Sequence, residues 1–229
     1  MSTRLVVNSS NELTEQRMPD NNQPAAVRVA ANIISYIFHP VFVPVYVVLF
    51  LLYIHPFMFV GYSSFEKVKV LIQSFLMYSF FPLITVLLLR ALNFIPTILL
   101  KTQKERFIPL IAVMTCSFWI WNVWRNLPEY PHETVLLTFA FFMATIAAWL
   151  MNIYFKVSLH AIAMGVMLSF SIYLGLTGSF NMGIYISLAL IITGLVCTAR
   201  LIVSDHSSKE IYAGLAGGIL AFFTAILFA

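Results

Sequence analysis

Three ionisable side chains stand at a fixed spacing late in the chain: Arg200, His206 and Glu210. They interrupt two long apolar stretches, although ionisable groups are costly close to hydrocarbon. Ser207 stands three residues before Glu210, the spacing of a capping box, which predicts that a helix begins here. His206 would then lie at a helix N-terminus, where free N–H groups favour an anion, and Arg200 offers donors matched to phosphate. The spacing therefore indicates a phosphate site.

Two earlier clusters carry side chains of the same kinds. One contains Lys101, Lys104 and Arg106, and the other contains Ser158 and His160. Together the three clusters supply cations and a hydroxyl, which can hold the nonbridging oxygens of a phosphate. They also supply two imidazoles, one to attack phosphorus and one to protonate the leaving group. Hydrolysis of a phosphate monoester through a covalent intermediate requires these groups.

The three clusters resemble the motifs of the type 2 phosphatidic acid phosphatase superfamily, whose members are integral membrane lipid phosphatases. The stretch ARLIVSDHSSKE, from Ala199, is similar to the third motif of that family, SRx5Hx3D. The stretch VSLH, from Val157, is similar to the second motif, PSGH. The stretch KTQKERFIP, from Lys101, is loosely similar to the first motif, Kx6RP.

The resemblance implies a role for each of these residues. His206 would be the nucleophile that forms a phosphohistidine, and His160 would be the general acid. Glu210 would be the carboxylate that orients the nucleophilic imidazole. The implied phosphate binders are Lys101, Lys104, Arg106, Ser158 and Arg200. The resemblance places the phosphatase core at about residues 101–229 and calls for a lipid phosphate substrate, with no cofactor and no metal.

The match to the family motifs has three differences. Val157, Leu159 and Glu210 stand where the family has proline, glycine and aspartate. These differences motivate a second hypothesis, a non-catalytic membrane protein of the same fold that binds or carries a lipid phosphate. A third hypothesis is a haem electron carrier with His160 and His206 as axial ligands. It fits less well, because both imidazoles stand among cations at helix ends.

The segments that must position these residues are apolar. Of the 229 residues, 61% are hydrophobic and 10% are charged, whereas soluble domains have about 25% charged residues. Seven apolar runs approach the roughly 20 residues that a membrane-spanning helix needs, at 33–59, 69–89, 107–123, 135–155, 160–176, 183–203 and 211–229. Two of them are short. The sequence therefore predicts an all-α, polytopic transmembrane bundle of six or seven spanning helices, surrounded by membrane lipids.

The order of the runs predicts on which side of the membrane the clusters lie. Two crossings separate each cluster from the next, so all three emerge on one face. With seven crossings, the amino terminus lies on that face and the carboxyl terminus on the other. The distribution of Lys and Arg favours the cytoplasmic face. The resemblance is to a divergent bacterial branch of the family, which implies the bacterial inner membrane. Because the net charge of +4 is spread over the loops, the sequence argues against a nucleic-acid partner.

The first part of the chain differs from the rest. Residues 1–28 are polar and lack the apolar stretch of a signal peptide, so we expect a tail without regular structure, followed by a single helical domain at 29–229. In the first apolar run, His39 and His55 each precede a proline. We interpret both as packing residues at kinks of one helix.

Small residues recur four positions apart in two of the later runs. They pair Ala161 with Gly165 and Gly214 with Gly218. This spacing lets helix backbones approach closely in membranes. It predicts tight packing between the fifth and the seventh run.

Overall fold

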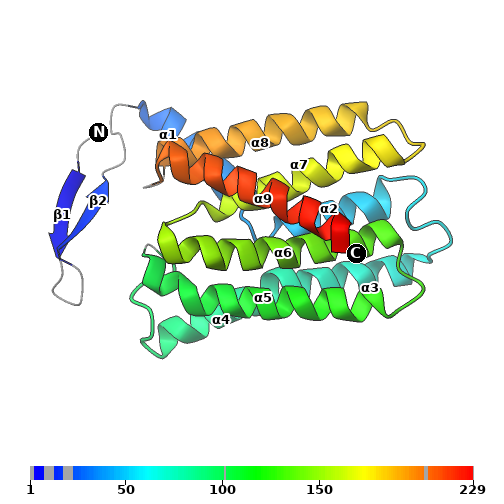
Figure 1. Cartoon of the computed structure of the whole chain (residues 1–229), viewed down its shortest axis with the longest axis horizontal. Coiled ribbons are helices and arrows are strands. Elements are labelled where there is room, and N and C mark those ends of the chain that lie inside the picture. The colour runs from blue at the N-terminus through cyan, green and yellow to red at the C-terminus, as the bar shows by residue number, and fades with distance from the viewer. Residues whose placement is uncertain (1–2, 8–12, 18–22, 101, 204–205, 229) are drawn as a thin grey trace.

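The computed structural model describes residues 3–7, 13–17, 23–100, 102–203 and 206–228, and its main body is a bundle of helices that run back and forth along one axis (Figure 1). Among these described residues, six helices are long and apolar enough to cross a membrane. They span Ser64–Ala91, Gln103–Arg125, His132–Tyr154, Leu159–Thr177, Gly183–Val203 and Ser208–Phe228. The predicted all-α polytopic bundle is confirmed, and the chain is an integral membrane protein.

The first predicted crossing is not one helix. It consists of α1 (Ala25–Ile37) and α2 (Val43–Tyr53), and the expectation of a single kinked helix at 33–59 is therefore wrong. Pro40 lacks an N–H and disfavours helical geometry at the residue before it, which ends α1. At 1.5 Å per residue the two helices are about 20 and 17 Å long, and neither spans a hydrocarbon core of about 30 Å alone.

The second crossing is continuous but contains a π turn. It comprises α3 (Ser64–Phe75), the π turn η1 (Leu76–Phe80) and α4 (Phe81–Ala91). Pro82, in the first turn of α4, has no N–H to donate to the carbonyl four residues earlier, which is the type of site where π turns occur. The hydroxyl of Ser79 donates to the carbonyl of Val41 at 2.8 Å. This bond ties the π turn to the break between α1 and α2.

The remaining crossings are α5 (Gln103–Arg125), α6 (His132–Tyr154), α7 (Leu159–Thr177), α8 (Gly183–Val203) and α9 (Ser208–Phe228). In Figure 1, α5, α7 and α9 begin at the end of the bundle where α4, α6 and α8 end. The three sequence clusters stand at these helix ends. They therefore gather at one end of the bundle, as the alternation of crossings predicts.

Glycines allow α7 and α9 to pack closely. A Cβ on Gly165 would collide with the carbonyl of Leu215, and one on Gly218 would collide with the carbonyl of Ile162. A Cβ on Gly214 would lie 2.8 Å from the Ser158 carbonyl oxygen. The close approach that the small-residue spacing predicts is confirmed.

The amino-terminal region also differs from the expectation. Two antiparallel strands, β1 (Thr3–Val7) and β2 (Leu13–Arg17), lie in the stretch that we expected to lack regular structure. Val6 and Val7 have the β-branched side chains that favour a strand. Helix α1 begins at Ala25, slightly before the expected start of the helical domain.

The glycine contacts predict a loss of stability in Gly218→Val. The added side chain forces α9 away from α7, and we expect the free energy of unfolding to fall by about 1–3 kcal/mol, as in other overpacked cores. The measurement is thermal unfolding of the purified protein in detergent. Gly194→Ala is the matched control, since nothing lies within 4 Å of a Cβ at Gly194. Equal unfolding midpoints for the two variants would contradict the prediction.

Candidate phosphate site

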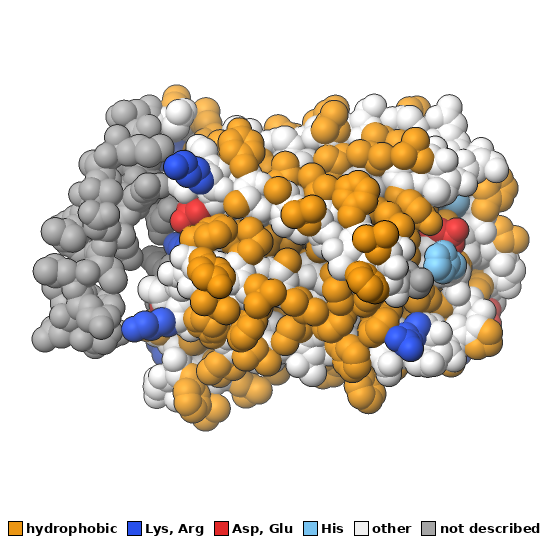
Figure 2. All heavy atoms as spheres, viewed as in Figure 1, with side chains coloured by type: hydrophobic (Ala, Val, Ile, Leu, Met, Phe, Trp, Pro, Cys, Tyr) orange, Lys and Arg blue, Asp and Glu red, His pale blue; other side chains and the backbone are white. Residues whose placement is uncertain are grey.

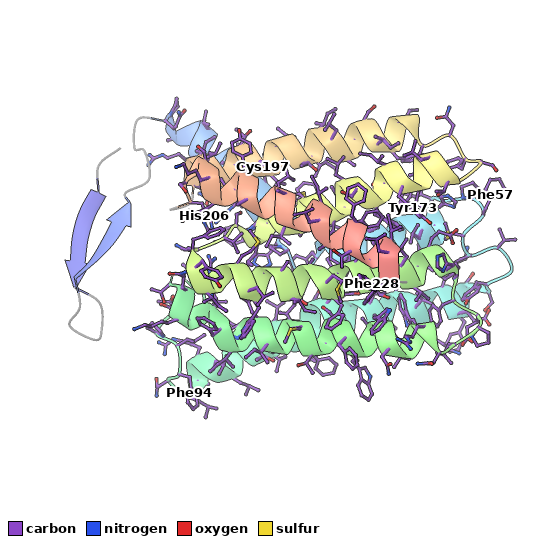
Figure 3. The ribbon with its side chains drawn as sticks, in the orientation of Figure 1. Phe57, Phe94, Tyr173, Cys197, His206 and Phe228 are labelled. Atoms are coloured by element: carbon purple, nitrogen blue, oxygen red, sulfur yellow. The ribbon has the colours of Figure 1, made fainter. Side chains whose placement is uncertain are left out.

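A cavity of about 560 Å³ opens at the end of the bundle where the clusters gather. Its polar part is lined by three imidazoles and three cations: His39, His160, His206, Arg106, Lys156 and Arg200. Figure 3 labels His206 at this end of the bundle, at the start of α9. Among the described residues that line the cavity there is no Asp or Glu. The lining therefore suits an anion.

The predicted capping box positions His206. The Ser207 hydroxyl accepts from the Glu210 amide at 3.3 Å, and Glu210 Oε2 accepts from the Ser207 amide at 2.7 Å. The same carboxylate oxygen lies 3.4 Å from Nδ1 of His206. Glu210 thus caps α9 and faces one nitrogen of the imidazole, which leaves Nε2 as the nitrogen with which His206 can attack or bind a ligand.

The surroundings of His206 keep its imidazole neutral. Burial lowers the pKa of His206 below its usual value of 6.5, and the positive charges of Arg106, Arg200 and Lys156 lower the pKa further. The contact with Glu210 raises the pKa and partly offsets these effects. A neutral imidazole has a free lone pair, which a nucleophile requires.

His160 is held from a different helix. Its Nε2 lies 3.0 Å from the carbonyl oxygen of Ser35 on α1. Because a carbonyl can only accept, Nε2 must carry the proton, and Nδ1 is the nitrogen that can exchange one. The His39 ring lies edge-on to the His160 ring, with 5.4 Å between centroids.

Arg106 links the segments that precede α5 and α7. Its Nε donates to the carbonyl of Leu100 at 3.0 Å, and its Nη1 donates to the carbonyl of Val157 at 2.9 Å. Leu100 has φ of 49°, a left-handed conformation that is uncommon for a residue with a side chain. Arg106 therefore both lines the cavity and stabilises the loops that precede α5 and α7.

Other predicted phosphate binders do not reach the cavity. Ser158 is fully buried at the N-cap of α7, where its hydroxyl accepts from the Ala161 amide at 3.5 Å, and it is not among the lining residues. Lys104 is exposed and also lies outside the lining. Lys101 lies outside the described residues. The structure thus brings together Arg106, Arg200, His160 and His206, with Glu210 behind His206.

Sequence reasoning missed two lining residues. Lys156 stands two positions before Ser158, and this proximity to the second cluster could have identified it as a lining residue. We interpreted His39 as a packing residue at a kink, but it lines the cavity at the break between α1 and α2. His55, in contrast, packs against aromatic rings such as Phe180, 5.2 Å away between centroids, and does not line the cavity.

The other part of the cavity is apolar and reaches exposed side chains at the surface of the bundle. Its walls include Leu83, Ile98 and Leu99. Tyr36 and Leu99 line it while 67% and 59% exposed, respectively. Figure 2 shows hydrophobic side chains across the middle of the visible face, with the visible Lys and Arg side chains near its two ends. The site therefore joins a cationic end to an apolar surface, which suits an amphiphilic anion.

Comparisons of the chain with protein-family models, with curated proteins and with solved structures found no match. Within the part of the chain that the structure describes, no group of three or more His, Cys, Asp and Glu side chains is placed to hold a metal ion. The chemistry of the site is therefore inferred from its own residues.

The charges around His206 predict how its pKa responds to substitution. Arg200→Gln removes a cation and should raise the pKa, whereas Glu210→Gln removes the stabilising anion and should lower it further. The pKa of His206 in the folded protein lies below 6.5, its value in the unfolded chain. As the pH falls through 6.5, the unfolded chain therefore binds the proton first, and the folded protein loses stability. The measurement is an NMR titration of ring-labelled histidine, with His206 assigned from the spectrum of His206→Asn.

The matched control for this titration is Lys209→Gln, which removes an exposed cation close in sequence that does not contribute to the pKa shift of His206. It should leave the midpoint of His206 unchanged. A midpoint at or above 6.5 in the native protein would show that burial and the neighbouring cations do not control this imidazole.

Proposed function

We propose that the chain is a membrane lipid phosphatase that hydrolyses a phosphomonoester or diphosphate of a phospholipid or isoprenoid lipid through a phosphohistidine. One observation carries the proposal. His160, His206, Arg106 and Arg200 come from separate segments and line one cavity, whose other walls are apolar and reach exposed side chains. The family resemblance assigns the same four residues to catalysis or phosphate binding.

The proposed reaction uses the imidazoles of His206 and His160. A bound phosphate monoester in its monoanionic form first leaves its proton on Nδ1 of His160. Nε2 of His206 forms a bond to phosphorus as the bond between phosphorus and the lipid oxygen breaks, and Nδ1 of His160 passes that proton to the lipid oxygen. Water then attacks the phosphohistidine, and Nδ1 of His160 takes a proton from the water and passes it to the departing phosphate. This step releases inorganic phosphate and restores both imidazoles. Arg106, Lys156 and Arg200 neutralise the charge on the nonbridging oxygens.

Glu210 supports the nucleophile in this reaction. Its carboxylate faces Nδ1 of His206 at 3.4 Å, so it stabilises the positive charge that the imidazole gains when Nε2 bonds to phosphorus. The capping bonds to Ser207 hold the carboxylate in place. Glu210 is thereby a positioning residue, in the place where the resembled family has aspartate.

The membrane environment selects the class of substrate. A headgroup phosphate at the cationic end would leave the tail along the apolar wall, and the exposed Tyr36 and Leu99 support an entrance for a lipid there. A small soluble phosphate ester would leave this apolar wall uncovered. The charge bias of the loops favours a site on the cytoplasmic face, and the family resemblance implies a bacterial inner membrane.

A second candidate function is a lipid-phosphate binder or carrier without turnover. Three observations favour it. Two donors of Arg106 are committed to main-chain carbonyls, the Ser158 hydroxyl caps a helix instead of lining the cavity, and Leu159 lines the cavity where the resembled family has glycine. Each of these three features reduces the number of hydrogen-bond donors that could stabilise the transition state of phosphate transfer.

Removal of the proposed nucleophile tests the phosphatase directly. Phosphate release from a panel of lipid phosphates by the detergent-solubilised chain should fall at least about a thousandfold in His206→Ala, as for other nucleophile deletions. His132→Ala is the matched control, because His132 is exposed in the first turn of α6 at the opposite end of the bundle. A folded His206→Ala protein that releases phosphate at the native rate would exclude His206 as the nucleophile.

The same panel separates the two candidate functions. If the folded native chain binds lipid phosphates and releases no phosphate from any of them, the binder is the correct assignment. In either case, Arg200→Ala should weaken binding at least about tenfold, because a charged hydrogen bond to the anion is lost. Binding that is unchanged in Arg200→Ala would place the phosphate elsewhere.

A further inference from the structure

Two hydroxyl groups in the apolar half of the cavity have no hydrogen-bond partner among the described residues. Tyr78 and Ser117 both line the cavity, and their residues are 3% and 1% exposed. Neither the Tyr78 hydroxyl nor the Ser117 hydroxyl is hydrogen-bonded within the described part of the chain. Two other serines in the bundle behave differently: Ser74 and Ser171 each donate to the carbonyl four residues earlier.

Both hydroxyls lie deep in the bundle. Ser117 follows Arg106 by eleven residues on α5, which places it about 16 Å further along the helix. Tyr78 lies in the π turn, midway along the crossing from Ser64 to Ala91, and its ring is 5.8 Å from that of Phe141. The two hydroxyls are therefore set apart along the bundle from Arg106, Arg200, His160 and His206, which stand at or near helix ends.

Burial of an unpaired hydroxyl is costly, so such groups normally have a partner from the protein, from water or from a ligand. Water can serve while the cavity is empty. A lipid chain that fills the apolar half displaces that water, and a pure hydrocarbon offers no replacement. An oxygen on the chain at this depth restores the hydrogen bonds.

We infer that the lipid bound in this cavity carries a hydrogen-bonding oxygen within its chain, at the depth of Tyr78 and Ser117. The class of ligand is an acyl or hydroxylated lipid phosphate whose hydroxyl, ester or amide group is separated from the phosphate, as opposed to an unsubstituted hydrocarbon or isoprenoid phosphate. This inference rests on the proposed function for the phosphate end of the ligand and names the substrate class of the same site.

Binding of matched phosphonates to the full chain tests the inference without turnover. The probes are hexadecyl phosphonate and three derivatives with one hydroxyl near the phosphonate, at mid-chain or at the chain end. We expect the native protein to bind one of the two derivatives with a remote hydroxyl about fivefold more tightly than the plain probe, the gain of about one net hydrogen bond. The measurement is the ligand-induced shift of thermal unfolding in detergent.

Two substitutions should remove this preference. Tyr78→Phe and Ser117→Ala each delete one hydroxyl, and they should bind the hydroxylated and plain probes more equally, with plain-probe binding unchanged or tighter. The matched controls are Tyr173→Phe and Ser171→Ala, which delete hydroxyls from residues that do not line the cavity. Both controls should keep the native preference.

The outcomes separate this inference from the proposed function. Equal binding of all probes by the native protein would overturn the inference while leaving the phosphate site intact, and so would a preference that survives both Tyr78→Phe and Ser117→Ala. Failure of every phosphonate to bind would overturn the inference and the proposed phosphate site together. If the native protein prefers a remotely hydroxylated phosphonate but releases phosphate from no lipid in the panel, the inference is supported and the chain is assigned as a binder.

Discussion

The contact between α7 and α9 is the interaction on which the site depends. Gly214 leaves room for the Ser158 carbonyl, and the Ser158 amide donates to the Glu210 carbonyl at 3.4 Å. These main-chain contacts hold the first turn of α9, with His206, against the first turn of α7, with His160. Two imidazoles from segments far apart in the sequence thereby share one cavity, because two helix backbones approach each other without intervening side chains.

The electrostatics of the site follow from that arrangement. The N-terminus of a helix carries a partial positive charge, and α5, α7 and α9 all begin around the cavity, beside Arg106, Lys156 and Arg200. These like charges destabilise one another when no anion is bound. Glu210 offsets part of this cost next to His206, and the main-chain carbonyls bonded to Arg106 offset another part. An anion in the cavity would offset the repulsion that remains.

Local sequence patterns were sufficient for the features that depend on neighbours in the chain. The capping box of Ser207 and Glu210 has a fixed spacing, and each long apolar helix shows directly as an apolar run. The same patterns could not show that Ser158 uses its hydroxyl for the helix cap, since a cap and a phosphate ligand need the same group. Nor could they place His39 in the cavity, because its position depends on packing between distant segments.

The broken crossing has a further physical consequence. In a continuous spanning helix, displacing one half costs main-chain hydrogen bonds that nothing in hydrocarbon replaces. Between α1 and α2 the main-chain ladder is interrupted, and the segment is held instead by the bonds of Ser79 to Val41, of His160 to Ser35 and of Tyr46 to Ile37, and by the packing of α1 against α8. Ser35, whose carbonyl faces His160, and Tyr36, which is exposed where it lines the cavity, are neighbours on α1. The orientation of the His160 imidazole and one wall of the cavity therefore depend on the same short helix.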